Sequence, residues 1–365
     1  MRISLTFFFI LFAWGLQAQY TLSQGESEIR FSSVIIGFYN HEFYADGVTE
    51  RPNNRFRLRD ARFKMDGTLS KKANFELEAD FANIIEEGQS GDRSILLDAW
   101  VNYQTFIDIK FGFQDIPYSR ESMISIRWNP FFNRSTAIGE AVSRRDLGVT
   151  LYKDFFNEKL KIWAGAYNGL GVLRNLNDAS GRLEYVARAE FSYPQAYNDR
   201  ILDLYNSAIP VVSLGVNTRY SDKATEDPNY PILIDGQRFQ YGLDFAFRYG
   251  GFSLIYEYQH ITATPNEGTI WTVDENGQFR APGHILYAAQ FIPKWKSVFA
   301  VRYDSFDSNS EQNNVMEEQL TLSYNYLVQD YDIVFRLNYL RNMTTLQSSN
   351  GNFDQVRLGL LFTIN

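Results

Sequence analysis

The sequence of 365 residues contains no cysteine and only three histidines, and it has no long apolar run beyond its first 16 residues. The lack of cysteine excludes a disulfide framework and any metal site with thiolate ligands. His41, His260 and His284 do not form a metal-ligand spacing such as HExxH, so we expect no metal site. A membrane helix needs about 20 apolar residues, and no later segment offers them. The net charge of −8 argues against nucleic acid as a partner.

The N-terminus has the pattern of a secretory leader. A short basic start, Met1-Arg2, precedes an apolar stretch from Ile3 to Leu16, and Leu16-Gln17-Ala18 is a plausible cleavage site. We therefore expect residues 1–18 to be a signal peptide. Residues 19–365 contain no linker, repeat or composition change, which indicates a single domain.

Aromatic residues make up 16% of the chain although its mean hydropathy is negative. They fall on alternate positions, as in the segment 183–193, where Tyr185 and Phe191 alternate with Glu184, Arg188 and Glu190. Such a segment is a strand with one apolar and one polar face. The last strand has one apolar face, formed by Val356, Leu358, Leu360, Phe362 and Ile364. This pattern is typical of a barrel that presents its apolar face to lipid.

Segments with this alternation recur sixteen times along the chain. They begin near residues 29, 56, 73, 94, 106, 145, 158, 182, 210, 238, 251, 284, 296, 316, 331 and 354. Short connections alternate with long ones, as periplasmic turns alternate with outer loops. We predict an all-β fold, a transmembrane antiparallel β-barrel of about 16 strands in the outer membrane of a bacterium. Fourteen or eighteen strands remain possible, and the segment Gln195 to Ala208 is either a short helix or an irregular periplasmic connection.

The most charged strand is FRLRDARFKMDG, from Phe56 to Gly67. Its apolar positions change parity, and a β-bulge near Asp60 would restore one apolar face. The cations that would then face the lumen are Arg57, Arg59, Arg62 and Lys64. A ladder of cations favours anions in a pore. Alternatively, Arg62 and Lys64 pair with the carboxylates of the next strand, Glu76, Glu78 and Asp80, which leaves Arg57 and Arg59 as the better candidates for solute contact.

A second group of cations lies in the long segment from Gln114 to Asp146. Its arginines are Arg120, Arg127, Arg134, Arg144 and Arg145, and its aromatic residues include Trp128, Phe131 and Phe132. Loops of this length are usually functional. We expect the part from Asp115 to Arg144 to fold into the barrel as a constriction loop and to bring its arginines to the narrowest point. The alternatives are a loop packed over the rim or one at a subunit interface.

The sequence offers no convincing enzyme site. Ser253 and His260 lie on one predicted strand, but nothing supports a catalytic pair. The stretch GAYNGLG, from Gly165 to Gly171, lacks the Lys and Ser/Thr of a phosphate-binding loop. We expect no enzymatic activity, no catalytic residue and no cofactor.

Several stretches, in order, resemble the phosphate-selective porin O and P family. They are FRLRDARFKMDG from Phe56, FGFQDIPYSRE from Phe111, SRRDLGVTLY from Ser143, GAYNGLG from Gly165 and VRYDSFD from Val301. The resemblance implies a sixteen-stranded barrel, commonly trimeric, with an inward loop and an arginine path for anions. Arg57, Arg59, Arg120 and Arg145 match arginines of the family's motifs. Asp60 departs from the pattern, because members often carry arginine there.

These observations together predict a passive outer-membrane porin for small hydrophilic solutes, biased towards anions such as phosphate or polyphosphate. Its expected partners are membrane lipid, the solutes and two further copies of itself in a homotrimer. One alternative is a sugar or general porin that uses the stacking surfaces of Trp100, Trp128, Phe131 and Phe132. The other is a plugged barrel that serves as a surface anchor or assembly component.

Overall fold

The computed structural model describes residues 20–44, 54–82, 95–136, 144–171, 178–197, 200–224, 233–313, 315–343 and 353–364. Nearly all regular structure in these ranges is strand. The strands are β1 (Tyr20–Gln24), β2 (Ser27–Tyr44), β3 (Arg55–Ser70), β4 (Ala73–Asp80), β5 (Leu96–Tyr103), β6 (Asp108–Asp115), β7 (Arg145–Phe155), β8 (Leu160–Tyr167), β9 (Glu184–Tyr193), β10 (Val211–Lys223), β11 (Gly236–Tyr249), β12 (Phe252–Pro265), β13 (Phe279–Ile292), β14 (Ser297–Asp307), β15 (Met316–Gln329), β16 (Ile333–Asn342) and β17 (Phe353–Ile364). The short helices are α3 (Arg120–Met123), η1 (Ile126–Trp128) and η3 (Pro293–Trp295).

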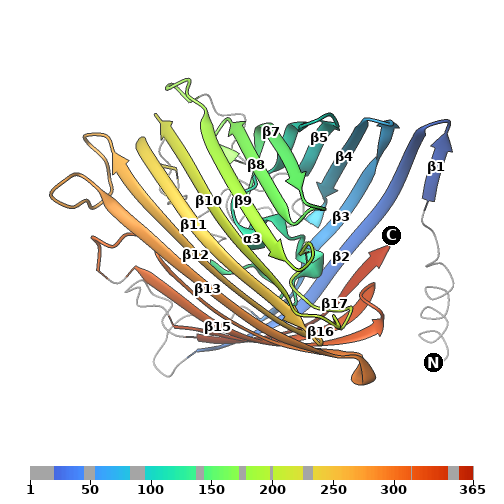
Figure 1. Cartoon of the computed structure of the whole chain (residues 1–365). Coiled ribbons are helices and arrows are strands. Elements are labelled where there is room, and N and C mark those ends of the chain that lie inside the picture. The colour runs from blue at the N-terminus through green and yellow to red at the C-terminus, as the bar shows by residue number, and fades with distance from the viewer. Residues whose placement is uncertain are drawn as a thin grey trace.

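Strands β2 to β17 form a closed antiparallel barrel of 16 strands (Figure 1). Each strand pairs with the next along the chain, and β17 pairs back onto β2 with Gly359 opposite Phe38. β1 pairs with β2 beyond the point where β17 ends, with Tyr20 opposite Phe31. The predicted fold class is confirmed, and each predicted segment corresponds to one barrel strand. The short β1 strand was not expected.

Among the residues that the structure describes, none of the helices is both long enough and apolar enough to cross a membrane.

Side chains alternate between the two surfaces of the barrel wall. In β11, Arg238 and Asp244 are buried in the interior, whereas Phe239, Tyr241 and Leu243 are exposed on the outside. The outer face of β17 is formed by Val356, Leu358, Leu360, Phe362 and Ile364, as predicted. The outer surface is thus apolar and aromatic, as a surface in contact with lipid must be.

The predicted bulge in β3 is present. Asp60 lies opposite Ile36 of β2, but the next pair joins Leu58 to Gly37, so Arg59 is the extra residue. Because the bulge restores the alternation, Phe56 and Phe63 are both exposed on the outside.

The connections differ in length at the two ends of the barrel. At one end the short turns comprise residues 71–72, 104–107, 156–159, 250–251, 293–296 and 330–332. Gly250 and Gly251 have positive φ angles of 58° and 80°, which a two-residue hairpin of the right twist requires. The predicted leader, 1–18, and large parts of the predicted outer loops lie outside the described residues.

Candidate functional site: the barrel interior

The segment from Ile116 to Thr136, here called the inner loop, carries α3 and η1, and α3 lies inside the barrel (Figure 1). Most residues of the inner loop are buried. Its first part is bound to β12. The carboxylate of Glu257 accepts hydrogen bonds from Ser119 Oγ at 2.7 Å, Arg120 N at 3.1 Å and Glu121 N at 2.6 Å. One buried carboxylate therefore fixes the start of α3 against this wall.

The second part of the inner loop is bound to strands β14 and β16. Phe132 N donates to Asn338 Oδ1 at 2.9 Å, and Arg336 Nη1 donates to the carbonyl oxygen of Phe131 at 3.0 Å. Arg302 Nη1 donates to the carbonyl oxygen of Asn133 at 2.8 Å. The loop therefore extends from β12 to β16 through the interior, with Phe131 and Phe132 buried.

Three cations of β3, Arg59, Arg62 and Lys64, are paired with carboxylates on their own or the neighbouring strand. Arg62 lies 2.6 Å from Asp60, 3.2 Å from Glu78 and 3.4 Å from Asp80. Lys64 Nζ lies 2.5 Å from Glu76. Arg59 also forms an ion pair with Asp60. Arg57 occupies an inward register position opposite Phe38.

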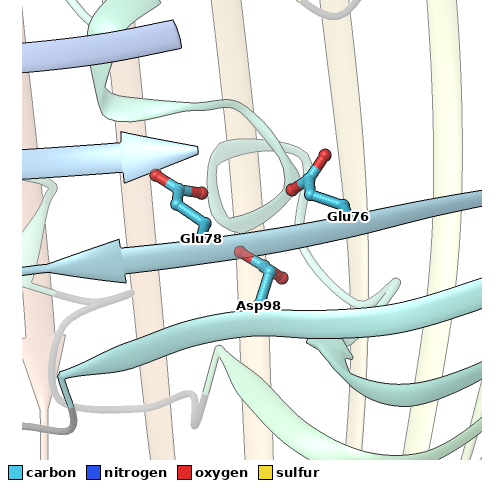
Figure 2. Close-up of side chains that lie close together, drawn as sticks. All are labelled: Glu76, Glu78 and Asp98. Carbon is cyan, nitrogen blue, oxygen red and sulfur yellow. The ribbon is translucent and has the colours of Figure 1, made fainter. Parts of the chain in front are cut away.

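Three carboxylates on adjacent strands β4 and β5 lie close together, with oxygen atoms of Glu76, Glu78 and Asp98 all within 4.8 Å of one another (Figure 2). Each of these carboxylates forms an ion pair with a cationic side chain of the protein. Glu76 is paired with Lys64, Glu78 with Arg62, and Asp98 with Arg145 at 2.7 Å. The cluster is therefore balanced by protein charges.

Arg120 is in α3 of the inner loop and packs against the opposite wall, formed by β9 to β11. Its guanidinium group is buried there. It is 2.6 Å from Asp244 and 3.2 Å from Glu190, and it donates to Ser213 Oγ at 2.8 Å. Burial opposes its charge, but the two carboxylates raise the pKa of Arg120 above its ordinary value. Arg127 differs, because it is partly exposed and its partner is Asp332 at 2.8 Å.

Arg134 is bound by backbone carbonyl groups of the inner loop. Within the ranges that the structure describes, it has no carboxylate at ion-pair distance, and its guanidinium group donates to the carbonyl oxygens of Glu121 and Ile124. Burial lowers the pKa of Arg134 to about 10, an effect that the charges of Arg59 and Arg145 strengthen.

Arg144 lies near this group. Its Nε is 3.0 Å from Asp115 and donates to the carbonyl oxygen of Ser122 at 2.7 Å. Burial lowers the pKa of Arg144 well below its ordinary value, and the charges of Arg134 and Arg145 lower it further. Three guanidinium groups thus repel one another where the inner loop meets β7.

A cavity of about 480 Å³ lies between the inner loop and the wall formed by β2 to β5. Its charged lining consists of Arg30, Arg62, Lys64, Arg127, Arg144 and Arg145, together with Asp66, Glu76, Glu78, Asp98 and Asp115. The six cations and five carboxylates leave a small excess of positive charge. Met123, Ser125 and Trp128 line it from the inner loop.

Sequence reasoning did not single out most of the interior arginines. Those in strands β9 to β17 include Arg188, Arg219, Arg238, Arg302, Arg336 and Arg357. The sequence did contain a pattern that could have identified them, because each occupies a polar position in a strand of alternating apolar and polar residues. Arg302 and Arg336 bind the backbone of the inner loop directly.

A closed antiparallel barrel of 16 strands with an apolar outer face and a charged interior has the architecture of an outer-membrane porin. The sequence profile of the family "Phosphate-selective porin O and P" matches residues 36–364. The chain belongs to this family, which places it in the outer membrane of a bacterium.

Comparison with solved structures agrees on the fold. In-vitro folded OmpT of Vibrio cholerae, described as a trimer form, is 10% identical, with 93% of this chain and 100% of that chain covered and a TM-score of 0.58. The outer-membrane channel DcaP of Acinetobacter baumannii is 11% identical, with 93% and 98% covered and a TM-score of 0.59. Salmonella typhi OmpF in complex with daunomycin is 11% identical, with 94% and 99% covered and a TM-score of 0.61. No curated protein sequence gives a significant match.

Proposed function

We propose that the protein is a passive porin whose narrow, charged passage favours small hydrophilic anions, with phosphate or polyphosphate as the expected solutes. The passage is the cavity between the inner loop and the wall of β2 to β5, and the inner loop is its constriction. The observation that carries the proposal is the excess of cations over carboxylates in the cavity lining, where the guanidinium groups of Arg144 and Arg145 repel each other and share the carboxylate of Asp115 at 3.0 and 3.4 Å. An anion that approaches them would relieve this repulsion, whereas a cation would increase it.

The bias towards anions is expected to be moderate. Most of the cations that line the passage already face a carboxylate, as Arg62 faces Glu78 and Lys64 faces Glu76. Such pairs contribute little net potential at a distance. Arg59 and Arg134 do not line this cavity. Among the cations that do, Arg144 is the better candidate for contact with solute, because it shares the carboxylate of Asp115 with Arg145.

The aromatic residues that a sugar porin would use for stacking are already in contact with other groups. The ring of Trp128 stacks on Tyr331 with centroids 5.2 Å apart, and Arg200 lies 3.8 Å from its centroid. Lys110 lies 4.1 Å from the Trp100 ring, and Phe131 and Phe132 are buried. These contacts favour an ion passage over a sugar passage.

Single-channel recording in planar bilayers tests the proposal. The protein should give discrete conductance steps and a reversal potential of anion-selective sign in a potassium chloride gradient, and phosphate should reduce the chloride current. Arg144→Gln, which removes a charge from the lining of the cavity, should move the reversal potential towards zero. Arg182→Gln is the matched control, because that side chain is 62% exposed and lies away from the cavity. A cation-selective reversal potential would contradict the anion bias.

A plugged barrel is the second candidate function, because one large apolar cluster joins the inner loop to the inside of the barrel wall. A plugged barrel would give no conductance steps in the same experiment. We also propose a homotrimer and expect no enzymatic activity. Ser253 faces the interior and its Oγ accepts a hydrogen bond from Asp203 N, whereas His260 is on the opposite face of β12.

A further inference from the structure

The connection between β9 and β10, residues 194–210, is here called the turn segment. It has 17 residues, whereas the other connections at this end of the barrel have two to four. The strands that it joins are direct neighbours, with Tyr193 opposite Val212. A short hairpin would join them equally well. The extra length is therefore not needed for the topology of the barrel.

Four described residues of the turn segment, Tyr197, Ile201, Leu202 and Asp203, are buried although they belong to a turn. Tyr197 and Ile201 are each 1% exposed, and Leu202 is 3% exposed. They pack in the same cluster as Ile126 and Phe131 of the inner loop. A turn in contact with water would instead expose such residues or lack them.

The barrel wall next to the turn segment is largely apolar, although Arg248 of β11 also faces this segment, 4.5 Å from the ring centroid of Tyr197. At the same end of strands β11 to β16, the inward positions hold Ala246, Ile255, Ala289, Val298, Leu327 and Val334, all buried in this cluster. Inward positions of a water-filled barrel are normally polar. This part of the wall therefore requires an apolar cover, and the turn segment and the inner loop supply it.

One buried carboxylate attaches the turn segment to the wall. Asp203 accepts hydrogen bonds from Ser207 N at 2.9 Å, Ser207 Oγ at 2.7 Å and Gly251 N at 2.9 Å. Its own backbone N–H donates to Ser253 Oγ at 2.8 Å. Asp203 is 1% exposed, so these bonds are shielded from water. The described part of the segment around Asp203 therefore belongs to the packed interior of the barrel.

The turn segment also contacts the inner loop directly. The guanidinium group of Arg200 lies 3.8 Å from the ring centroid of Trp128, and that of Arg120 lies 5.1 Å from the ring centroid of Tyr197. Both are cation–π contacts. Since Trp128 lines the charged cavity, Arg200 holds a side chain that forms the wall of the passage.

We infer that the turn segment is a second wall of the passage: it seals the apolar side of the barrel and positions the inner loop, so that solutes cross only through the charged cavity beside β2 to β5. This inference rests on the proposed porin function. Asp203 and Arg200 are positioning residues in this account, the first through the wall and the second through Trp128.

Replacement of residues 196–208 by Asn-Gly tests the inference in planar bilayers. Conductance should rise about two-fold or more, and the reversal potential should move towards zero, because ions would then also pass a largely apolar wall outside the charged cavity. Ile209→Ala is the control, because that side chain is in the same segment but 47% exposed. A shortened variant with the conductance and reversal potential of the unaltered protein would overturn the inference.

Arg200→Ala tests the positioning role in the full-length chain. It should increase open-channel current noise, because Trp128 loses its cation–π partner, and Arg200→Lys should restore a quiet channel. Equal noise in all three proteins would overturn the role of Arg200.

Thiol labelling provides a test that does not depend on conductance. The chain has no cysteine, so Ile201→Cys and Ile209→Cys each introduce a single thiol. A charged maleimide should label the second variant in the folded protein and the first only after heat unfolding. Equal labelling rates in the folded state would show that the segment is not buried.

These experiments separate the inference from the proposed function. If the unaltered protein carries no current and the shortened variant does, the porin function fails while the sealing role of the turn segment is supported. If the unaltered protein conducts and the shortened variant is identical to it, the porin function stands and the inference fails.

Discussion

Arg120 lies between Asp244 and Glu190, all three groups being buried in the barrel interior. Removal of a cation from such a site leaves two carboxylates without their partner in a region of low dielectric constant. Arg127, with its partly exposed partner Asp332, lies at the other extreme. The same residue type on the same loop is thus structural at one position and accessible at another.

Arg120→Ala should destabilise the barrel by about 3–5 kcal/mol, because it uncouples a buried ion-pair network. Arg127→Ala is the matched control and should cost no more than about 1 kcal/mol, because its pair is near water. Urea unfolding, followed by the change in electrophoretic mobility on unfolding, measures both. Equal losses of unfolding free energy in the two variants would contradict the difference in burial between Arg120 and Arg127.

The sequence predicted whether a charged side chain points into the barrel, but it did not predict most of the ion pairs that these side chains form. Arg62 and Lys64 were expected either to meet solute or to pair with the next strand, and the structure places both against its carboxylates. That alternative could be weighed because the strands are consecutive. Arg120 and Asp244 are 124 residues apart, and no local pattern predicts their contact. Whether the predicted site arginines contact solute stays a prediction.

The inner loop is an element without its own core, and wall side chains determine its position. Glu257 alone accepts three hydrogen bonds from Ser119, Arg120 and Glu121 at the start of α3. The polar network on the wall therefore fixes the start of this loop, while Ile126, Phe131 and Phe132 hold its later part in the apolar cluster.

Glu257→Leu should release the first part of the inner loop, because the three donors lose their common acceptor. Trypsin added to the folded protein should then cleave after Arg127 or Arg134 several times faster. Gln259→Leu, on the same face of the same strand, is the control and should be cleaved like the unaltered protein. Unchanged resistance of Glu257→Leu would mean that other contacts alone hold the loop.

The strands and the β3 bulge could be predicted from the alternation of apolar and polar residues. This period of two is preserved wherever one face of a strand meets lipid. The turn segment did not follow from the same reasoning. Its stretch QAYNDRILDLYNSA has no clear period, and the alternatives of a short helix or an irregular connection both remained open. The described part of it is irregular. Its burial depends on the apolar positions of β11 to β16, which only the closed barrel brings together.

At the scale of the whole molecule, the interior is divided into two parts. The apolar cluster lies mainly along β11 to β17 and reaches β2 through Ile36 and Phe38, whereas charged groups line the cavity beside β2 to β5. A barrel of 16 strands is wide enough for a water-filled channel. In the proposed function, the filled side reduces that width to one narrow passage, and for this reason we expect charge selectivity although the barrel itself is wide.

The homotrimer is also a prediction at this scale. Light scattering in a mild detergent should give about three times the mass of one chain, and heating should convert this species to the monomer before the barrel unfolds. Folded protein that is monomeric under all mild conditions would contradict the trimer without affecting the account of the passage.

The most direct test of the account is a thiol placed in the passage. Ser125→Cys lies on the cavity side of the inner loop, in a chain that has no other cysteine, and Ile209→Cys lies outside the cavity. A bulky charged thiol reagent should reduce the single-channel current of the first variant by about half or more and leave that of the second unchanged. Full labelling of Ser125→Cys without loss of current would contradict the claim that solutes cross through this cavity.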